Sequence, residues 1–166
     1  GDRAFERTAK LTAVELPESL KKMGYGVFFE SGLTEVVIPS DVAIVSDYAF
    51  AESSSLRKVV LSEGVASIAS GAFRQTSSLK ELRLPESLHA IRDYAFTGSG
   101  LVSVALPKGL TKIAKGAFQN CTKLGNITIP GSLAVLGPSA FEGCSKLTSV
   151  IIPPALEGIL ENTFKD

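Results

Sequence analysis

The chain has 166 residues, with 17 basic and 17 acidic side chains that give a formal net charge of zero. A neutral chain argues against a dedicated nucleic-acid-binding protein, because such proteins carry a basic surplus. One histidine and two cysteines are too few for most metal sites, a histidine-dependent active site or a disulfide scaffold. No apolar run is long enough to span a bilayer and no signal-peptide pattern is present, so we expect no membrane insertion of this chain.

The dominant feature of the sequence is an internal repeat of about 23 residues. Each unit begins at the leucine of the pattern Leu-x-x-apolar-x-apolar, and a phenylalanine follows 17 residues after every start. The unit starts are 22 or 23 residues apart, at Leu11, Leu33, Leu56, Leu79, Leu101, Leu124 and Leu147. The phenylalanines are Phe28, Phe50, Phe73, Phe96, Phe118, Phe141 and Phe164. The repeat predicts a single domain over residues 1–166, with partial units at both ends.

Two apolar segments in each unit predict two sides of one structural repeat. The first segment alternates apolar and polar residues, as around Val36 and Ile38, which predicts a half-buried strand. A proline, which lacks a ladder donor, ends this segment in the units with Pro17, Pro39, Pro85, Pro107, Pro130 and Pro153. The second segment has two apolar residues three apart, such as Leu88 and Ile91, and fits a helical or 3₁₀ turn or a short bent strand.

A single unit is too small to fold alone. It offers about six large apolar side chains, each worth roughly 1.5–3 kcal/mol when buried. Ordering about 23 residues costs on the order of 1–2 kcal/mol each for the backbone. We therefore expect a solenoid in which stacked units bury each other's faces. Its first strands should form one continuous parallel sheet, and its phenylalanines should form an inner ladder.

The unit resembles the BspA-like, or treponemal-class, leucine-rich repeats, and Leu101 to Cys121 and Leu124 to Cys144 match that consensus best. The Ala-Phe pair of the family recurs at Ala49-Phe50, Ala72-Phe73, Ala95-Phe96, Ala117-Phe118 and Ala140-Phe141. The resemblance implies a curved, right-handed leucine-rich-repeat solenoid of about seven rungs, mainly parallel β with short 3₁₀ or irregular convex segments. It also implies an extracellular, cell-surface or periplasmic bacterial protein that acts in adhesion, in binding of host matrix proteins or in other protein–protein interactions.

The two end units depart from the family pattern. Val27-Phe28 and Thr163-Phe164 replace the Ala-Phe pair, and neither end has a distinct polar cap. Solenoids require polar capping units, and an uncapped sheet edge can pair with another molecule. A structural spacer that self-associates through its ends is therefore an alternative function.

The exposed side of the predicted first sheet, its concave face, is the leading candidate for binding a protein ligand. Glu35, Lys58 and Glu81 occupy one repeat position and predict a ladder of alternating charge. Val37, Val60 and Ile151 are apolar where solvent is expected, which indicates either β-propensity or an apolar strip for a partner. The candidate site on this face is Glu35, Val37, Lys58, Val60, Glu81, Arg83 and Ile151.

Charge is uneven along the chain. Residues 1–56 carry nine acidic and five basic side chains, whereas residues 57–123 carry four and ten. The candidate basic patch is Arg57, Lys80, Arg92, Lys108, Lys112 and Lys115. These residues are interpreted either as ordinary solvated surface or as a patch for an anionic glycan or an acidic protein.

The cysteines occupy the same repeat position in adjacent units. That position elsewhere holds serine or threonine, so we interpret Cys121 and Cys144 as buried free thiols. Adjacent rungs would place their Cα atoms about 4.8 Å apart, so a disulfide is the alternative.

No motif of the chain indicates an enzyme, a cofactor or a metal site. His89 is interpreted as solvated, and the phosphate-loop, nucleophile-elbow and zinc-helix patterns are absent. Tyr48 and Tyr94 share a repeat position with glycines and are interpreted as partly buried packing residues. The leading hypothesis is a non-enzymatic interaction or adhesion module.

Overall fold

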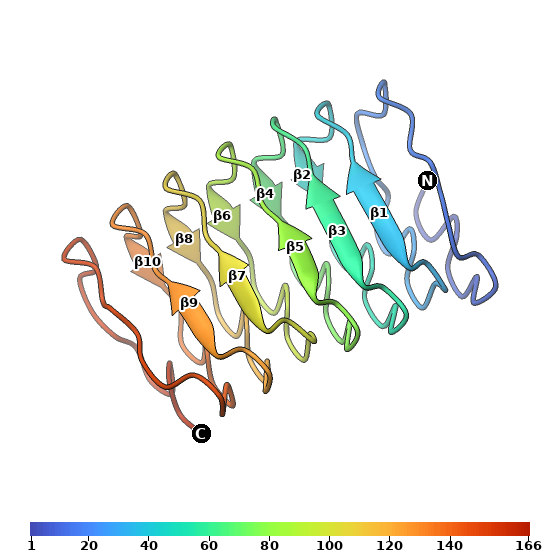
Figure 1. Ribbon diagram of the computed structural model, residues 1–166. Coiled ribbons are helices and arrows are strands. Elements are labelled where there is room, and N and C mark those ends of the chain that lie inside the picture. Colours follow the sequence, from blue (N-terminus) through green and yellow to red (C-terminus); the bar gives the residue numbers. More distant parts are fainter.

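The computed structural model describes residues 1–166 as a coil of stacked turns, or rungs, built from strands and turns without helices (Figure 1). Five consecutive rungs contribute two short strands each. The first strands are β1 (Glu35–Ile38), β3 (Lys58–Leu61), β5 (Glu81–Arg83), β7 (Ser103–Ala105) and β9 (Asn126–Thr128). The second strands are β2 (Ile44–Val45), β4 (Ser67–Ile68), β6 (Ala90–Ile91), β8 (Lys112–Ile113) and β10 (Val135–Leu136). The expected parallel solenoid is confirmed, and it contains no helix that could cross a bilayer.

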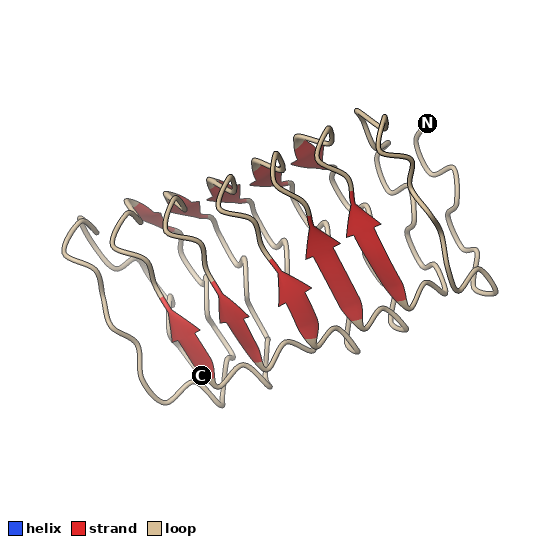
Figure 2. Cartoon of the chain, turned by 45° about the horizontal axis from the view of Figure 1, so that its top comes forward, coloured by secondary structure: helices blue, strands red, loops and turns tan.

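The second strands form one uninterrupted parallel sheet, in the order β10-β8-β6-β4-β2, along one side of the coil (Figure 2). Its main-chain hydrogen bonds run from each rung to the rung before it. Ala69 N–H donates to the Val45 carbonyl and Ala114 N–H to the Ile91 carbonyl, both at 2.9 Å. The sequence left a helical or 3₁₀ turn and a short strand as alternatives for this second segment. The structure has the short strand and no 3₁₀ segment, and the chain on either side of the strand is irregular.

The first strands do not form the single continuous sheet that the repeat predicts. β1, β3 and β5 form one sheet, β7 and β9 form another, and the units that begin at Leu11 and Leu147 contribute no strand. The break between β5 and β7 coincides with one of the two places where unit starts are 22 residues apart instead of 23. The other such place lies before β1, in the unit where both sheets begin, and both sheets end with the Leu124 unit. A shorter connection shifts the strand that follows it relative to the preceding rung. Because hydrogen bonding between strands depends on their register, such a shift can interrupt the sheet.

Both shortened connections contain a glycine directly before the unit leucine, at Gly32 and Gly100. A Cβ at Gly32 would collide with the carbonyl oxygen of Ala9, and a Cβ at Gly100 with the carbonyl oxygen of Ser77. The short route therefore passes directly against the backbone of the preceding rung, which only a residue without a side chain permits.

Eight phenylalanine rings stack through the middle of the coil, as the repeat predicts. Neighbouring ring centroids lie 5.1–5.6 Å apart and neighbouring planes lie within 13° of each other. The six rings from Phe28 to Phe141 are at most 1% exposed, whereas Phe5 is 41% exposed. Each buried ring packs between two others and so links its unit to both neighbours.

Tyrosine and glycine alternate at one position beside this ladder for a steric reason. Tyr48 and Tyr94 have φ angles of 55° and 58°, and Gly71 and Gly116, in the units that follow them, have φ angles of 61° and 58°. A Cβ at Gly71 would lie 2.7 Å from the Tyr48 ring, and one at Gly116 would lie 2.5 Å from the Tyr94 ring. Each tyrosine ring thus covers the glycine of the next rung, and both tyrosines are partly buried, as predicted.

The two cysteines are free and buried, as interpreted from the sequence. The Sγ of Cys121 donates to the Phe96 carbonyl and the Sγ of Cys144 to the Phe118 carbonyl, both at 3.1 Å. Ser53 Oγ makes the same kind of bond to a phenylalanine carbonyl at 2.8 Å. The thiols therefore satisfy a backbone acceptor of the preceding rung, as the hydroxyl does. Hydrogen bonding with Cys121 and burial raise the pKa of the Cys144 thiol, which keeps it protonated.

Candidate functional site

The concave face is the exposed side of β1, β3, β5, β7 and β9, and two rows of side chains cross its strands. The register pairs Glu35 with Lys58 and Lys58 with Glu81, which forms the first row. It also pairs Val37 with Val60 and Val60 with Arg83. Glu15 occupies the same repeat position one unit earlier, so the second row is Glu15, Val37, Val60 and Arg83.

The first row contains one ion pair instead of the full charge ladder that the sequence predicts. Lys58 Nζ lies 3.8 Å from Glu81 Oε2, and the structure has no ion pair between Lys58 and Glu35. The two paired side chains are 49% and 73% exposed. Such a pair contributes about 0–1 kcal/mol at most, so its carboxylate and ammonium remain available to a partner.

The second row brings two of the three predicted apolar residues together. Val37 is 55% exposed on β1, and Val60 is half-buried beside it on β3. Ile151 is 80% exposed, but it lies four units further along the chain, in the last unit, which has no strand. The apolar strip is therefore confined to the N-terminal half of the concave face.

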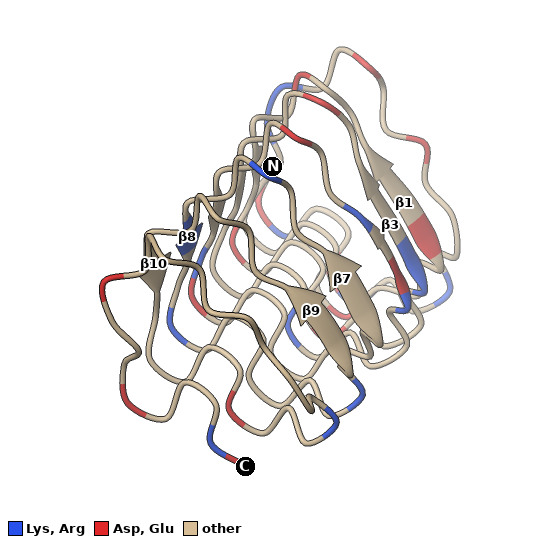
Figure 3. Cartoon of the chain, turned by 60° about the vertical axis from the view of Figure 1, so that its left-hand side comes forward, with Lys and Arg blue, Asp and Glu red and all other residues tan.

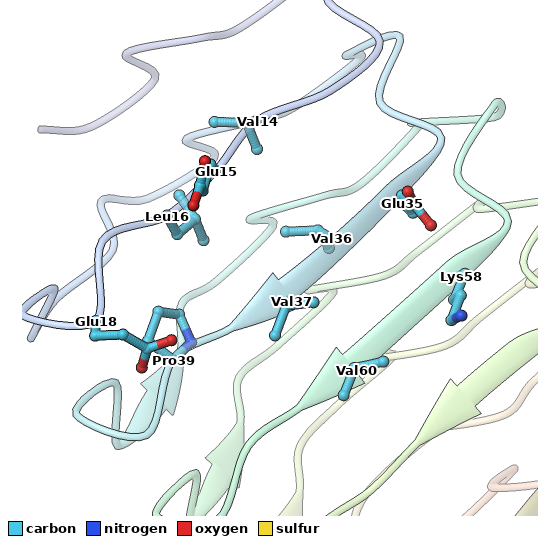
Figure 4. Close-up of a pocket in the computed structure, with 10 residues that line it drawn as sticks. All are labelled: Val14, Glu15, Leu16, Glu18, Glu35, Val36, Val37, Pro39, Lys58 and Val60. Carbon is cyan, nitrogen blue, oxygen red and sulfur yellow. The ribbon is translucent and has the colours of Figure 1, made fainter.

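A hollow of about 450 Å³ opens where the Leu11 unit diverges from β1 (Figure 4). We call it the N-terminal hollow. Glu15, Glu18 and Glu35 bring three carboxylates to it, against the single ammonium group of Lys58. Val14, Leu16, Val36, Val37, Pro39 and Val60 supply its apolar lining. The hollow is therefore an acidic site with an apolar surface.

A second hollow, of about 510 Å³, lies at the interruption between β5 and β7, and we call it the central hollow. Lys58, Lys80 and Arg83 bring three cations to it, against the single carboxylate of Glu81. Figure 3 shows the acidic end of β1 beside the basic end of β3, whereas β7 and β9 carry no charged residue. The concave face is thus polarised from an acidic to a basic hollow, followed by an uncharged region.

Sequence reasoning did not select Glu15 and Glu18 as candidate site residues. Glu15 shares the repeat position of Val37, which was a detectable signal, and Glu18 follows Pro17. Both belong to the Leu11 unit, which forms no strand. Its segment does not pair with β1, and the N-terminal hollow lies between the two. The divergence that forms the hollow has no separate sequence signal beyond the 22-residue spacing.

The six basic residues predicted to form a patch lie on different sides of the rungs. Lys112 lies in β8 of the second sheet, whereas Lys80 directly precedes β5 of the first. The others are Arg57 before β3, Arg92 after β6, Lys108 after β7 and Lys115 after β8. The structure therefore does not bring the six together as one patch, although Lys80 N–H donates to the Arg57 carbonyl of the preceding rung. Only Lys80 among them lines a concave hollow.

Charged residues also line a smaller hollow of about 190 Å³ away from the concave face, with Arg3, Glu6, Glu52 and Arg74. The structure contains no group of three or more histidine, cysteine, aspartate or glutamate residues that could hold a metal ion. His89 is exposed at the start of β6, in agreement with its interpretation as a solvated residue. The concave face combines exposed apolar side chains with an acidic and a basic hollow.

A family model described as the BspA type leucine-rich repeat region, with six copies, matches residues 1–99 and 66–166 and so spans the chain. The chain belongs to the BspA-type leucine-rich-repeat family. The match accounts for the internal repeat of the chain. No curated protein matches the chain.

Three solved structures of bacterial leucine-rich-repeat proteins resemble this BspA-type chain. A Bacteroides ovatus protein has 29% identity and a TM-score of 0.72 over 91% of this chain and 45% of its own. The T. pallidum leucine-rich repeat protein has 30% identity and a TM-score of 0.68 over 72% and 59%. A leucine-rich cell surface protein of Faecalibacterium prausnitzii has 25% identity and a TM-score of 0.69 over 89% and 49%. The chain spans about half the length of these relatives.

Proposed function

We propose that this chain is a non-enzymatic module of a bacterial surface protein that binds a protein ligand, such as a host matrix protein, through its concave face. The observation that carries the proposal is Val37, which is 55% exposed and lines a hollow together with three carboxylates. Membership of a family whose relatives include a cell surface protein supports the location.

The chemistry of the concave face suits a protein ligand. Fully burying a valine side chain is worth roughly 1.5–3 kcal/mol, so Val37 and Val60 together offer a source of affinity. The charges around them would select partners and speed encounter more than they would add affinity. An apolar centre within a charged rim is the usual anatomy of a protein–protein interface.

The test is solid-phase binding of the chain to a panel of purified extracellular-matrix proteins. The variant Val37→Glu/Val60→Glu should lose at least about tenfold in affinity, equivalent to about 1.4 kcal/mol. The matched control is Ile44→Glu/Val135→Glu, because these second-sheet residues are 46% and 45% exposed. The control should bind like the unmodified chain.

Two outcomes would overturn the proposal. Absence of binding to every member of the panel would reject the adhesive role. Equal affinities of the concave variant and the unmodified chain, with both folded by thermal unfolding, would reject the concave face as the binding surface.

Self-association is a second candidate function, favoured by apolar exposure in the last unit. Ile151, Ile159 and Leu160 are 80%, 56% and 51% exposed. An apolar hollow of about 300 Å³ lies beside them, with Phe164 in its lining. Sedimentation over a range of concentrations should detect association that Ile159→Glu/Leu160→Glu abolishes. A strict monomer at all concentrations would reject this function.

A further inference from the structure

The second row of the concave face joins the two hollows. Glu15 and both valines line the N-terminal hollow, and Val60 and Arg83 line the central hollow. Val60 lines both hollows, so the two hollows adjoin each other on the first sheet. Four successive rungs thus present an acidic, an apolar, an apolar and a basic residue at one repeat position, and the last three are in register on β1, β3 and β5.

The length of this line matches an extended polypeptide. Neighbouring parallel strands lie about 4.8 Å apart, so Val37 and Arg83 are separated by two spacings, or roughly 10 Å. Glu15 lies further out, because its segment diverges from β1 and leaves the N-terminal hollow between them. An extended chain advances about 3.3 Å per residue, so four residues cover about 13 Å. Side chains at i, i+2 and i+4 of such a chain point to the same side. One extended segment of five residues can therefore place a side chain at Arg83, another over the two valines and a third in the N-terminal hollow.

We propose that the second row binds an extended segment of the partner that runs across the strands and presents a basic, an apolar and an acidic residue at alternate positions. The basic residue lies in the N-terminal hollow, where three carboxylates face one ammonium group. The apolar residue covers Val37 and Val60. The acidic residue meets Arg83 in the central hollow, where three cations face one carboxylate. The inference rests on the proposed function and specifies the chemistry of the ligand.

The row also explains why the two interruptions of the first sheet matter together. One interruption forms the acidic hollow and the other forms the basic hollow, and β1, β3 and β5 between them hold the row in register. Because only side chains of the row make these contacts, the segment can be read in either chain direction. The spacing of its charges, four residues apart, is the discriminating property.

The experiment is selection of a phage-displayed library of random dodecapeptides on the immobilised chain. We expect enrichment of peptides with Lys or Arg and Asp or Glu four residues apart, and an apolar residue midway between them. Selection on Arg83→Glu should replace the acidic position by a second basic residue. Lys112→Glu, the same charge change on exposed β8 of the second sheet, should select the same peptides as the unmodified chain.

The outcomes separate this inference from the proposed function. The selected peptides could lack the spaced charges and still lose binding to Val37→Glu/Val60→Glu. That result would reject the proposed charge pattern of the ligand but support the concave face as the binding surface. Enriched peptides that bind the same variant unchanged would overturn both. Absence of any enrichment would overturn the extended-segment ligand, while the matrix-protein panel would still decide the proposed function.

Discussion

The two sheets of this solenoid are built by the same units, yet only the second is continuous. β2 to β10 pair without interruption, whereas the first strands separate into groups of three and two. The one-residue deletion at Gly100 lies directly before β7, and the chain has regained its register by β8, which pairs with β6. The regular sheet therefore maintains the stack, while the irregular sheet gains hollows in which charge can collect.

Removing one phenylalanine ring should affect both sheets and produce the largest effect. Phe96 is fully buried between the rings of Phe73 and Phe118. Phe96→Ala should lower the free energy of unfolding by about 3–5 kcal/mol, measured by urea denaturation, because it leaves a cavity in the ladder. Phe5→Ala, at a ring that is 41% exposed, is the control and should cost less. A loss below about 1 kcal/mol for Phe96→Ala would reject the ladder as the core.

Adding a single methyl group at a shortened connection should disturb the first sheet selectively. Gly100→Ala forces a Cβ against the Ser77 carbonyl and should cost about 1–3 kcal/mol in urea denaturation. Gly131→Ala is the matched control, because no heavy atom lies within 4 Å of the Cβ it introduces. Equal changes in the two variants would contradict the steric role assigned to Gly100.

Restoring the 23-residue spacing should remove the difference between the two sheets. A serine inserted between Ser99 and Gly100 gives that unit the spacing of its neighbours and should pair β7 with β5. The amides of residues 103–105 should then exchange hydrogen about five- to tenfold more slowly, as expected for a bond worth about 1 kcal/mol. Amides of β8 serve as the internal reference. Unchanged exchange at residues 103–105 would show that spacing alone does not cause the interruption.

The smallest effect is expected for the exposed ion pair of the first row. A double-mutant cycle of Lys58→Ala and Glu81→Ala should give a coupling energy of at most about 1 kcal/mol, because both side chains are solvated. Screening should reduce this coupling at about 1 M salt, where the Debye length is near 3 Å. A larger coupling that is insensitive to salt would indicate that the first row stabilises the sheet.

The fold could be predicted because every unit repeats the same buried positions. The leucine starts, the phenylalanines and the small residues at Cys121 and Cys144 each mark one location in the rung. Whether the first sheet is continuous could not be predicted from the sequence. The one-residue change in spacing is visible at Gly100, but its effect on hydrogen bonding depends on how the strands align in three dimensions. The basic residues were grouped by their closeness in sequence, yet positions along a rung only nine residues apart lie on different sheets, as Ser103 and Lys112 do. The hollows arise from this same geometry.

The tyrosine–glycine alternation constrains how such a protein can be rearranged by duplication or shuffling of its units. A Tyr94-type unit needs a glycine at the same position in the unit that follows, because its ring lies where that residue's Cβ would be. Two such units in succession would place a side chain against a ring. Consensus similarity therefore does not make the units interchangeable: each carries a steric requirement on its successor, and their order is encoded residue by residue along the coil.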